Sequence, residues 1–305
     1  MSVARRLVGK RWEIGKGAEQ FPELLRLIPE APARLHGIGD IAALKQLSLA
    51  VVGARKATPY GLGCAKYFAR RAALGNLAVV SGGAIGCDQA AHQGALDGEG
   101  ITVVVLGCGA DVVYPARAFA LYQEIIDRGG AVVSEAPWGS PPVGWGFKRR
   151  NRIIAGLARA TLIVEAGVPS GTFSTADATL AQGKDVLAVP GSIFSRESKG
   201  SNRLIAQGAV PIVDDESFED ALNAVFGTLR CSMETDKSCD EDIGRGQRGT
   251  AGETLAALTA SPMRAEELIG LCGKDVIQVI RFLSELEMSG AIERLRDGRY
   301  TTKPR

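Results

Sequence analysis

The stretch LAVVSGGAIGCDQAAHQGALDGEGITVVVLG, residues 77–107, contains one complete instance of the pattern that decides the fold. An apolar run at 77–82 is followed by a helix-like segment at 88–98 and by a second apolar run at 101–107. Both runs are almost continuously apolar and rich in valine, which is typical of strands buried on both faces of a parallel sheet. The stretch therefore predicts a strand, a crossover helix and a parallel neighbouring strand.

The same alternation continues on both sides of this stretch. Further apolar runs are SLAVVG, GAVVSE, TLIVEA, DVLAVP and AVPIV. Helix-like segments lie between the runs, at about 60–75, 116–128, 151–159, 173–183 and 201–207. This order predicts an α/β fold, a Rossmann-like doubly wound and mainly parallel sheet spanning 47–227. Residues 1–46 are expected to form an extended segment that packs on this core.

The C-terminal part of the chain has a different character. Residues 228–250 combine Gly, Ser and charged residues without apolar periodicity, which predicts a linker. Two short helix patterns and a longer one follow, and then AIERLRDGRYTT, which predicts a hairpin with a two-residue turn at Asp297-Gly298. Residues 251–305 are therefore expected to form a winged helix-turn-helix domain, and contact with duplex DNA and contact with a protein both stay open.

Composition excludes several classes of protein. The net charge is only +2 over 305 residues, so a basic surface would have to be local. The six cysteines show no CxxC pair, which favours neither a zinc site nor a disulfide framework and suggests reduced cytoplasmic thiols. No apolar run approaches the ~18 residues of a membrane span. With neither GxGxxG nor a P-loop, and only two histidines, we expect no cofactor, metal or catalytic residue.

Three loops at the expected carboxyl edge of the sheet carry groups that suit an anion. Ligands of open parallel sheets bind at this edge, where helix N-termini point. The first loop, around Gly53, carries Arg55 and Lys56. The second is the Ser81-Gly82-Gly83 turn, whose backbone N–H groups can approach a phosphate closely. The third, Ser170-Gly171-Thr172, adds hydroxyl groups, although simple helix capping explains it equally well.

The stretch GFKRRNRIIAGLA, residues 146–158, places four cations beside a predicted helix start. A helix start carries partial positive charge, so cations there are unfavourable unless an anion is bound or the loop is fully solvated. We expect Asn151 to cap this helix, with most of the cations just outside its free N–H groups. The cations are Lys148, Arg149, Arg150 and Arg152. Several such loops on one edge predict a polyanion site, and single-stranded DNA fits it.

Six motifs occur in an order that resembles one family: GARKATPYG, VVSGGAIGCDQAAH, LGCGADVVYP, FKRRNRIIAGLA, SGTFSTADATLAQGKDVLAVPGS and GSNRLIAQGA. The sequence closely resembles the DNA-processing protein A family, also called the Smf family, over about residues 20–215. The tail resembles the optional winged-helix domain of that family. The helical domain that often precedes the Rossmann domain in the family is not expected here.

The resemblance implies a non-enzymatic protein that binds single-stranded DNA without sequence preference. It implies protection of incoming DNA in natural transformation, loading of a RecA-type recombinase onto that DNA, a homodimer and a cytoplasmic location without membrane contact. The residues expected to bind DNA, from the loops and the resemblance together, are Gly53, Arg55, Lys56, Ser81, Gly82, Gly83, Lys148, Arg149, Arg150, Asn151, Arg152, Ser170, Gly171 and Thr172.

This chain departs from the family pattern at the second loop. Family members usually carry an arginine where this chain has Ile85, and an isoleucine where it has Cys87. The missing arginine removes one expected phosphate contact. Lys148 and Arg149 are expected to compensate.

The alternative reading is a nucleoside-monophosphate phosphoribohydrolase of the lysine-decarboxylase-like (LOG) family, whose PGGxGTxxE motif supplies a glutamate needed for the chemistry. When PSGTFST is aligned on Gly171 and Thr172, Thr175 stands at the glutamate position. When it is aligned on Pro169, Asp177 stands there but the GT pair is lost. Neither alignment restores the motif, so the binding function is favoured.

Overall fold

The computed structural model describes residues 6–168, 170–227, 257–258, 262–272, 276–295 and 297–302. The described residues form two compact units, a large one within residues 6–57 and 64–227 and a small one that includes the described C-terminal residues. The predicted linker at 228–250 lies outside the described residues, so the predicted domain boundaries stay a prediction.

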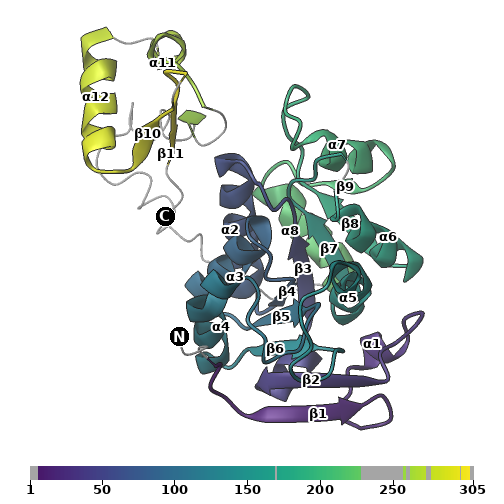
Figure 1. Ribbon diagram of the computed structural model, residues 1–305. Coiled ribbons are helices and arrows are strands. Elements are labelled where there is room, and N and C mark those ends of the chain that lie inside the picture. The colour runs from purple at the N-terminus through teal and green to yellow at the C-terminus, as the bar shows by residue number, and fades with distance from the viewer. Residues whose placement is uncertain are drawn as a thin grey trace. The chain divides into compact units, whose positions relative to one another are not determined.

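The large unit is built on a sheet that, in the described chain, has the strand order β1-β2-β6-β5-β4-β3-β7-β8-β9 (Figure 1). Every strand pair from β6 to β9 is parallel, while β1 and β2 are antiparallel to their neighbours. This confirms the predicted mainly parallel sheet. The strands are β1 (Arg11–Gly15), β2 (Arg34–Gly39), β3 (Ser48–Val52), β4 (Ala78–Ser81), β5 (Thr102–Leu106), β6 (Ala131–Ser134), β7 (Ala160–Ile163), β8 (Asp185–Ala188) and β9 (Val210–Pro211).

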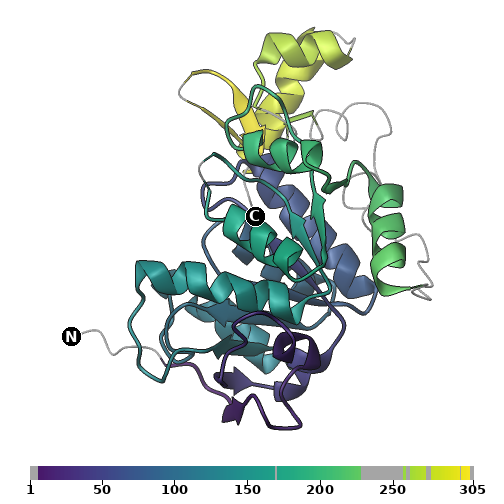
Figure 2. The ribbon, with the colours of Figure 1, turned by 90° about the vertical axis from the view of Figure 1, so that its right-hand side faces the viewer.

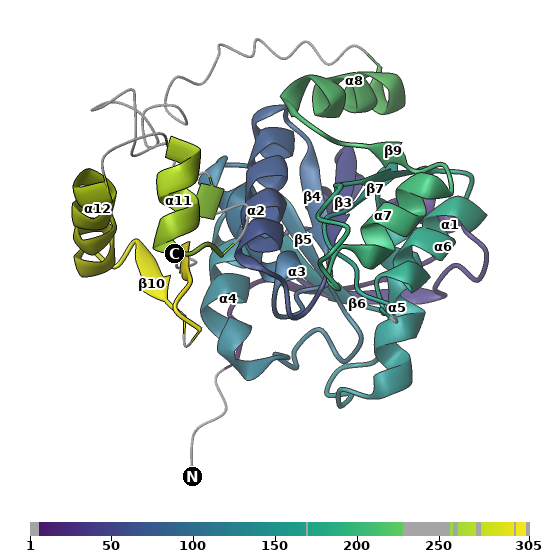
Figure 3. The ribbon, with the colours of Figure 1, turned by 90° about the horizontal axis from the view of Figure 1, so that it is seen from above.

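Helices cover both faces of this sheet. In the large unit these are α1 (Glu23–Arg26), α2 (Pro59–Leu74), α3 (Cys87–Asp97), α4 (Phe119–Asp127), α5 (Gly144–Leu157), α6 (Phe173–Ala181), α7 (Lys199–Ala206) and α8 (Asp215–Phe226), with 3-10 turns η1 (Ile41–Lys45) and η2 (Ala116–Ala118). Figures 2 and 3 show α5, α6 and α7 on the face opposite α3 and α4. Within β5, Val103 packs in the cluster that contains Ile153 of α5, and Val104 packs in the cluster that contains Tyr122 of α4. The near-continuous apolarity of the strands therefore reflects burial on two sides.

The N-terminal segment contributes more regular structure than an extended chain. Strands β1 and β2 pair with each other, and β2 joins the sheet beside β6. Trp12 stands opposite Gly37, and a side chain on Gly37 would overlap the Trp12 indole. The glycine therefore makes room for the tryptophan in the two edge strands.

The small unit contains α11 (Ala265–Cys272), α12 (Val276–Met288) and an antiparallel hairpin of β10 (Ile292–Arg294) and β11 (Tyr300–Thr302). Its buried side chains are Leu258, Leu268, Val279, Leu283 and Ile292. The hairpin is confirmed, but its turn is longer than predicted. The Leu295 N–H donates to the Arg299 carbonyl, so more than two residues lie between the strands, and Gly298 takes the left-handed conformation (φ +86°).

Within the part of the chain that the structure describes, no helix combines the length and the apolarity needed to cross a membrane.

Candidate functional site

A pocket of about 600 Å³ lies in the large unit, beyond the carboxyl ends of β3, β7 and β8. Strand β3 lies between β4 and β7, so the sheet extends from it in both directions. Such a reversal of strand order is where open α/β sheets bind ligands. The residues lining the pocket are Val52, Gly53, Ala54, Arg55, Lys56, Ala84, Asp88, Gly144, Phe147, Lys148, Arg150, Asn151, Ile154, Gly167, Val168, Ser170, Gly171, Thr172, Thr175, Arg196 and Glu197.

Helix α5 forms one wall of the pocket, and its start differs from the prediction. The helix begins at Gly144, not at Asn151, so Asn151 does not cap it and the cations lie within the helix. The first turn can form because Gly146 packs directly on the backbone of Gly107, where a side chain would overlap the Gly107 carbonyl. The cations therefore do not oppose the helix N-terminus; they radiate from the second and third turns in different directions.

The far end of α5 is fixed by a lysine. Lys184 Nζ donates to the carbonyl oxygens of Ala155 and Ala158, at 2.7 Å each. A cation at the last carbonyls of a helix favours the helix dipole. Partial burial lowers the pKa of Lys184 to about 8.

Arg150 forms the floor of the pocket. Its side chain is buried, and its Nη1 donates to the carbonyl oxygens of Gly82 (2.7 Å) and Val105. Its Nε donates to the Asn151 Oδ1 at 2.9 Å. Burial lowers the pKa of Arg150, while the nearby Asp88 carboxylate opposes that change. The guanidinium thus joins α5 to the ends of β4 and β5.

Asp88 is the buried carboxylate that faces this guanidinium. It does not cap α3; it accepts hydrogen bonds from the backbone N–H groups of Ala84 (3.3 Å) and Gly53. Burial raises the pKa of Asp88, and Arg150 acts in the opposite direction. The pair therefore connects the loops that follow β3 and β4.

Four exposed cations surround the mouth of the pocket: Arg55, Lys56, Lys148 and Arg196. Among the described residues, no carboxylate lies within ion-pair distance of any of them. The Arg55 guanidinium lies 5.6 Å from the centre of the Phe147 ring, and the Tyr114 ring lies 5.3 Å from that centre. An arginine over an aromatic face is favourable and keeps its N–H groups available at the edges. The mouth of the pocket therefore presents four cations that make no direct ion pair within the described chain, although the carboxylates of Asp88 and Glu197 also line the pocket.

Asn151 connects α5 to the opposite wall. Its Nδ2 donates to the Ser174 Oγ at 2.6 Å and to the Gly171 carbonyl at 3.4 Å. On the same loop, the Ser170 Oγ donates to the Thr172 Oγ1 (2.9 Å) and accepts from the Thr172 N–H (3.1 Å). The loop is thus held at the pocket with its hydroxyls engaged internally.

The Ser81-Gly82-Gly83 turn, which was predicted to approach a phosphate, does not line the pocket. Ser81 is fully buried and its hydroxyl donates to the Val51 carbonyl at 2.6 Å. A side chain on Gly82 would overlap the Arg150 guanidinium, and one on Gly83 (φ +68°) would overlap the Tyr122 hydroxyl. The glycines make room for these two side chains, and only Ala84 of this loop reaches the pocket.

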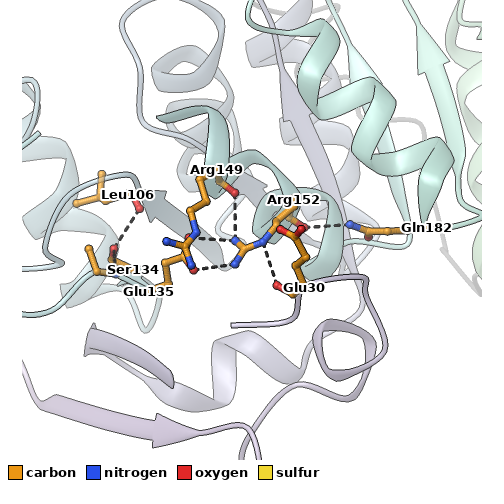
Figure 4. A network of polar contacts seen from close by, with 8 residues as sticks. Glu30, Leu106, Ser134, Glu135, Arg149, Arg152 and Gln182 are labelled. Atoms are coloured by element: carbon orange, nitrogen blue, oxygen red, sulfur yellow. Dashed lines mark hydrogen bonds and ion pairs between the residues drawn. The ribbon is translucent and has the colours of Figure 1, made fainter. Parts of the chain in front are cut away.

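Arg149 and Arg152 do not line the pocket, and Figure 4 shows their guanidinium groups at Glu135. Arg152 makes a two-pronged contact with Glu135 (3.0 and 2.7 Å) and donates through Nε to the Glu30 carbonyl (3.0 Å). Its side chain is only 13% exposed. Arg149 lies 3.3 Å from the same carboxylate. The predicted cluster of Arg150, Asn151 and Arg152 is therefore divided between two sides of α5.

Sequence reasoning missed Arg196 and Glu197, which lie in the loop after β8. This loop falls within the GSIFSRESKGSN stretch, at the carboxyl end of a strand that was predicted. Reading every loop at that edge of the sheet would have found them. Ile85, where the family usually has an arginine, does not line the pocket, whereas Lys148 does.

Other polar groups give no sign of catalysis or metal binding. His92 is buried, with Nδ1 2.7 Å from the Thr102 Oγ1, and burial lowers its pKa to about 3. At the position of the hydrolase glutamate the pocket presents Thr175, and Asp177 is exposed outside the lining. Among the described residues, no three His, Cys, Asp or Glu side chains gather as metal ligands would.

The sequence matches the family model of the DNA recombination-mediator protein A over residues 13–225. The chain belongs to this family. Residues 248–298 match the DprA winged helix domain, which confirms the winged-helix assignment of the C-terminal region. The resemblance stated from the six motifs is thereby confirmed.

Relatives support the assignment over most of the chain. Protein Smf of Escherichia coli (strain K12) is 34% identical over 281 residues, which cover 92% of this chain and 75% of that protein. A putative DNA processing protein DprA of Mycobacterium tuberculosis (strain H37Rv) is 38% identical over 269 residues, which cover 88% of this chain and 66% of that protein.

Solved structures of the family share the fold. The X-ray structure of DNA processing protein A from Streptococcus pneumoniae has a TM-score of 0.64 and 36% identity, covering 68% of this chain and 73% of that chain. The protein from Helicobacter pylori, whose structure concerns its single-stranded DNA binding mode, has a TM-score of 0.63 and 28% identity, covering 71% of this chain and 95% of that chain.

Proposed function

We propose that the pocket binds the backbone phosphates of single-stranded DNA, and that the chain acts in DNA processing during natural transformation by binding rather than by catalysis. The observation that carries this proposal is the group of four exposed cations, Arg55, Lys56, Lys148 and Arg196, without carboxylate partners among the described residues. The family membership and the single-stranded DNA binding of the Helicobacter pylori relative support it.

The geometry divides the binding residues into two groups. Arg150 and Asp88 are buried and mutually compensated, so they fix the floor and add little net charge at the surface. The exposed cations can reach phosphate oxygens as point charges or as guanidinium forks. Such contacts read no base, so the proposed binding is indifferent to sequence.

The test is fluorescence anisotropy with a labelled single-stranded oligonucleotide and the matching duplex, measured with the full chain over a series of salt concentrations. We expect tighter binding to the single strand, and a log–log dependence of affinity on salt with a slope of about −0.7 for each neutralised phosphate. Equal or tighter binding to the duplex, or affinity that does not change with salt, would contradict the proposal.

The partners implied by the family are part of the same proposal. We propose that the chain forms a homodimer, transfers the bound strand to a RecA-type recombinase and resides in the cytoplasm, the last supported by cysteines that suggest no disulfide framework. Helices α11 and α12 together carry four glutamates and one arginine, Arg281, which pairs with Glu285. Residues 251–305 as a whole carry eight acidic and eight basic residues, so charge does not decide between a protein and duplex phosphates as the partner of the winged helix.

A further inference from the structure

The loop between β8 and α7 exposes two large apolar side chains. Phe194 is 90% exposed and Ile193 is 75% exposed. No large hydrophobic residue in the described chain is more exposed than Phe194. Such side chains on a surface loop indicate a contact with another molecule when they border a binding site.

The loop is fixed in place by its own hydrogen bonds. The Gly191 N–H donates to the Asn202 Oδ1 (3.0 Å), and the Asn202 Nδ2 donates back to the Gly191 carbonyl (2.9 Å). The Ser195 N–H donates to the Ser192 carbonyl at 3.0 Å, which closes a turn with Ile193 and Phe194 at its tip. The exposure of Phe194 therefore results from a defined backbone.

The same loop continues into the pocket. Arg196, two residues after Phe194, lines the pocket and contributes one of its exposed cations. The loop after β7 lies beside Arg196: a Cβ atom added at Gly167 would be 3.6 Å from the Arg196 carbonyl oxygen. The neighbouring Val168 also lines the pocket and is 52% exposed. The exposed apolar side chains and one of the pocket cations thus lie on the same loop.

We propose that Phe194 stacks on a nucleobase of the same DNA strand whose phosphates occupy the pocket; this inference rests on the proposed function. Proteins that bind single strands combine a cationic groove along the backbone with aromatic rings on which bases stack, and an exposed ring on a loop of the pocket can cover one base. The Phe194 ring is available for this contact, whereas Phe147, at the mouth of the pocket, is already in contact with Arg55 and Tyr114. Every base has a flat face, so such stacking keeps the binding independent of sequence.

The experiment separates base contacts from phosphate contacts. Anisotropy titrations use two labelled strands of equal length, a thymidine oligonucleotide and its fully abasic counterpart, which has the same charge and no bases. The proteins are the unaltered chain, Phe194→Ala, Phe194→Trp and, as a matched control, Leu180→Ala, which removes a 57% exposed side chain on α6 that does not line the pocket.

We expect Phe194→Ala to weaken binding of the thymidine strand about 5-fold, the lower end for one stacked base, while abasic binding and the salt slope stay unchanged. Phe194→Trp should retain the affinity of the unaltered chain, and Leu180→Ala should have no effect. Equal effects of Phe194→Ala on both strands, or none on either, would overturn the stacking and leave the proposed function standing. If sedimentation shows that Phe194→Ala changes the mass of the protein in solution, the loop forms a contact between copies of the chain. That result would also overturn the stacking proposal. Failure of the unaltered chain to bind either strand would overturn both proposals.

Discussion

Both sides of α5 carry basic side chains, but among the described residues only those on one side are paired with a carboxylate. On one side, Lys148 is exposed at the pocket and the described chain offers it no carboxylate. On the other side, Arg149 and Arg152 share the carboxylate of Glu135 and contribute to holding α5 against the sheet. A run of cations is therefore not by itself a binding surface. What matters is whether the protein already neutralises each charge.

The first test of this contrast concerns Arg150, which shares a property with the residues on each side of α5. Arg150 lines the pocket, yet it is buried and fully engaged. Arg150→Met should lower the free energy of unfolding by about 3 kcal/mol, because two buried carbonyl groups would lose their donor and the buried Asp88 carboxylate would lose a nearby positive charge. Urea denaturation measures this change. A loss below about 1 kcal/mol would show that the guanidinium acts mainly as a surface cation.

The buried histidine behind Arg150 gives a pH dependence of stability. The folded pKa of His92 lies at about 3, below the usual value, so the unfolded chain binds this proton first as the pH falls. Stability from this group is present above about pH 6.5 and is lost below it, by about 1.4 kcal/mol per pH unit. We expect about 2 kcal/mol between pH 6.5 and pH 5 in urea denaturation series. His92→Gln should reduce that slope, and an identical slope would contradict the assignment.

Arg152→Ala should destabilise the chain but leave DNA binding unchanged, unlike the substitution of an exposed pocket cation. Its removal leaves the Glu30 carbonyl without this donor and weakens the hold on Glu135, with an expected loss of about 1 to 2 kcal/mol. The salt slope of DNA binding, measured below the temperature of unfolding, should not change. A reduced salt slope with unchanged stability would show that Arg152 contacts DNA and would contradict the difference between the two sides of α5.

Lys148→Ala should weaken DNA binding and leave the stability of the chain unchanged. The side chain is exposed and makes no hydrogen bond or ion pair within the described chain, so stability should stay within about 0.5 kcal/mol. The salt slope should fall by about 0.7, which corresponds to one phosphate contact. Lys45→Ala, which removes an exposed lysine at the end of η1, is the matched control and should leave the slope unchanged.

The sequence predicted the sheet well because its strands are buried on both faces, and continuous valine-rich runs report that directly. It failed at the start of α5. Gly144 and Gly146 are poor helix formers, and only the backbone contact between Gly146 and Gly107 makes the first turn favourable. That contact joins residues far apart in the sequence, so local preference cannot reveal it.

This error also caused the misplaced cations. With the helix start set at Asn151, the cations seemed to share one loop. In a helix that begins at Gly144, the 3.6-residue period separates Arg149 and Arg152 from Arg150 and Asn151. The edge strands β1 and β2 were missed for a related reason, because Gly37 looks like a strand breaker until Trp12 is seen to cover it.

Helix α5 is held at both ends, by Gly146 on Gly107 and by Lys184 on its last carbonyls. The wall of the pocket therefore exists before DNA arrives, and no slow rearrangement has to precede binding. Capture should be a single bimolecular step whose observed rate rises linearly with DNA concentration. Added salt should reduce mainly the association rate constant, because dissolved ions screen the long-range attraction between the exposed cations and the DNA strand.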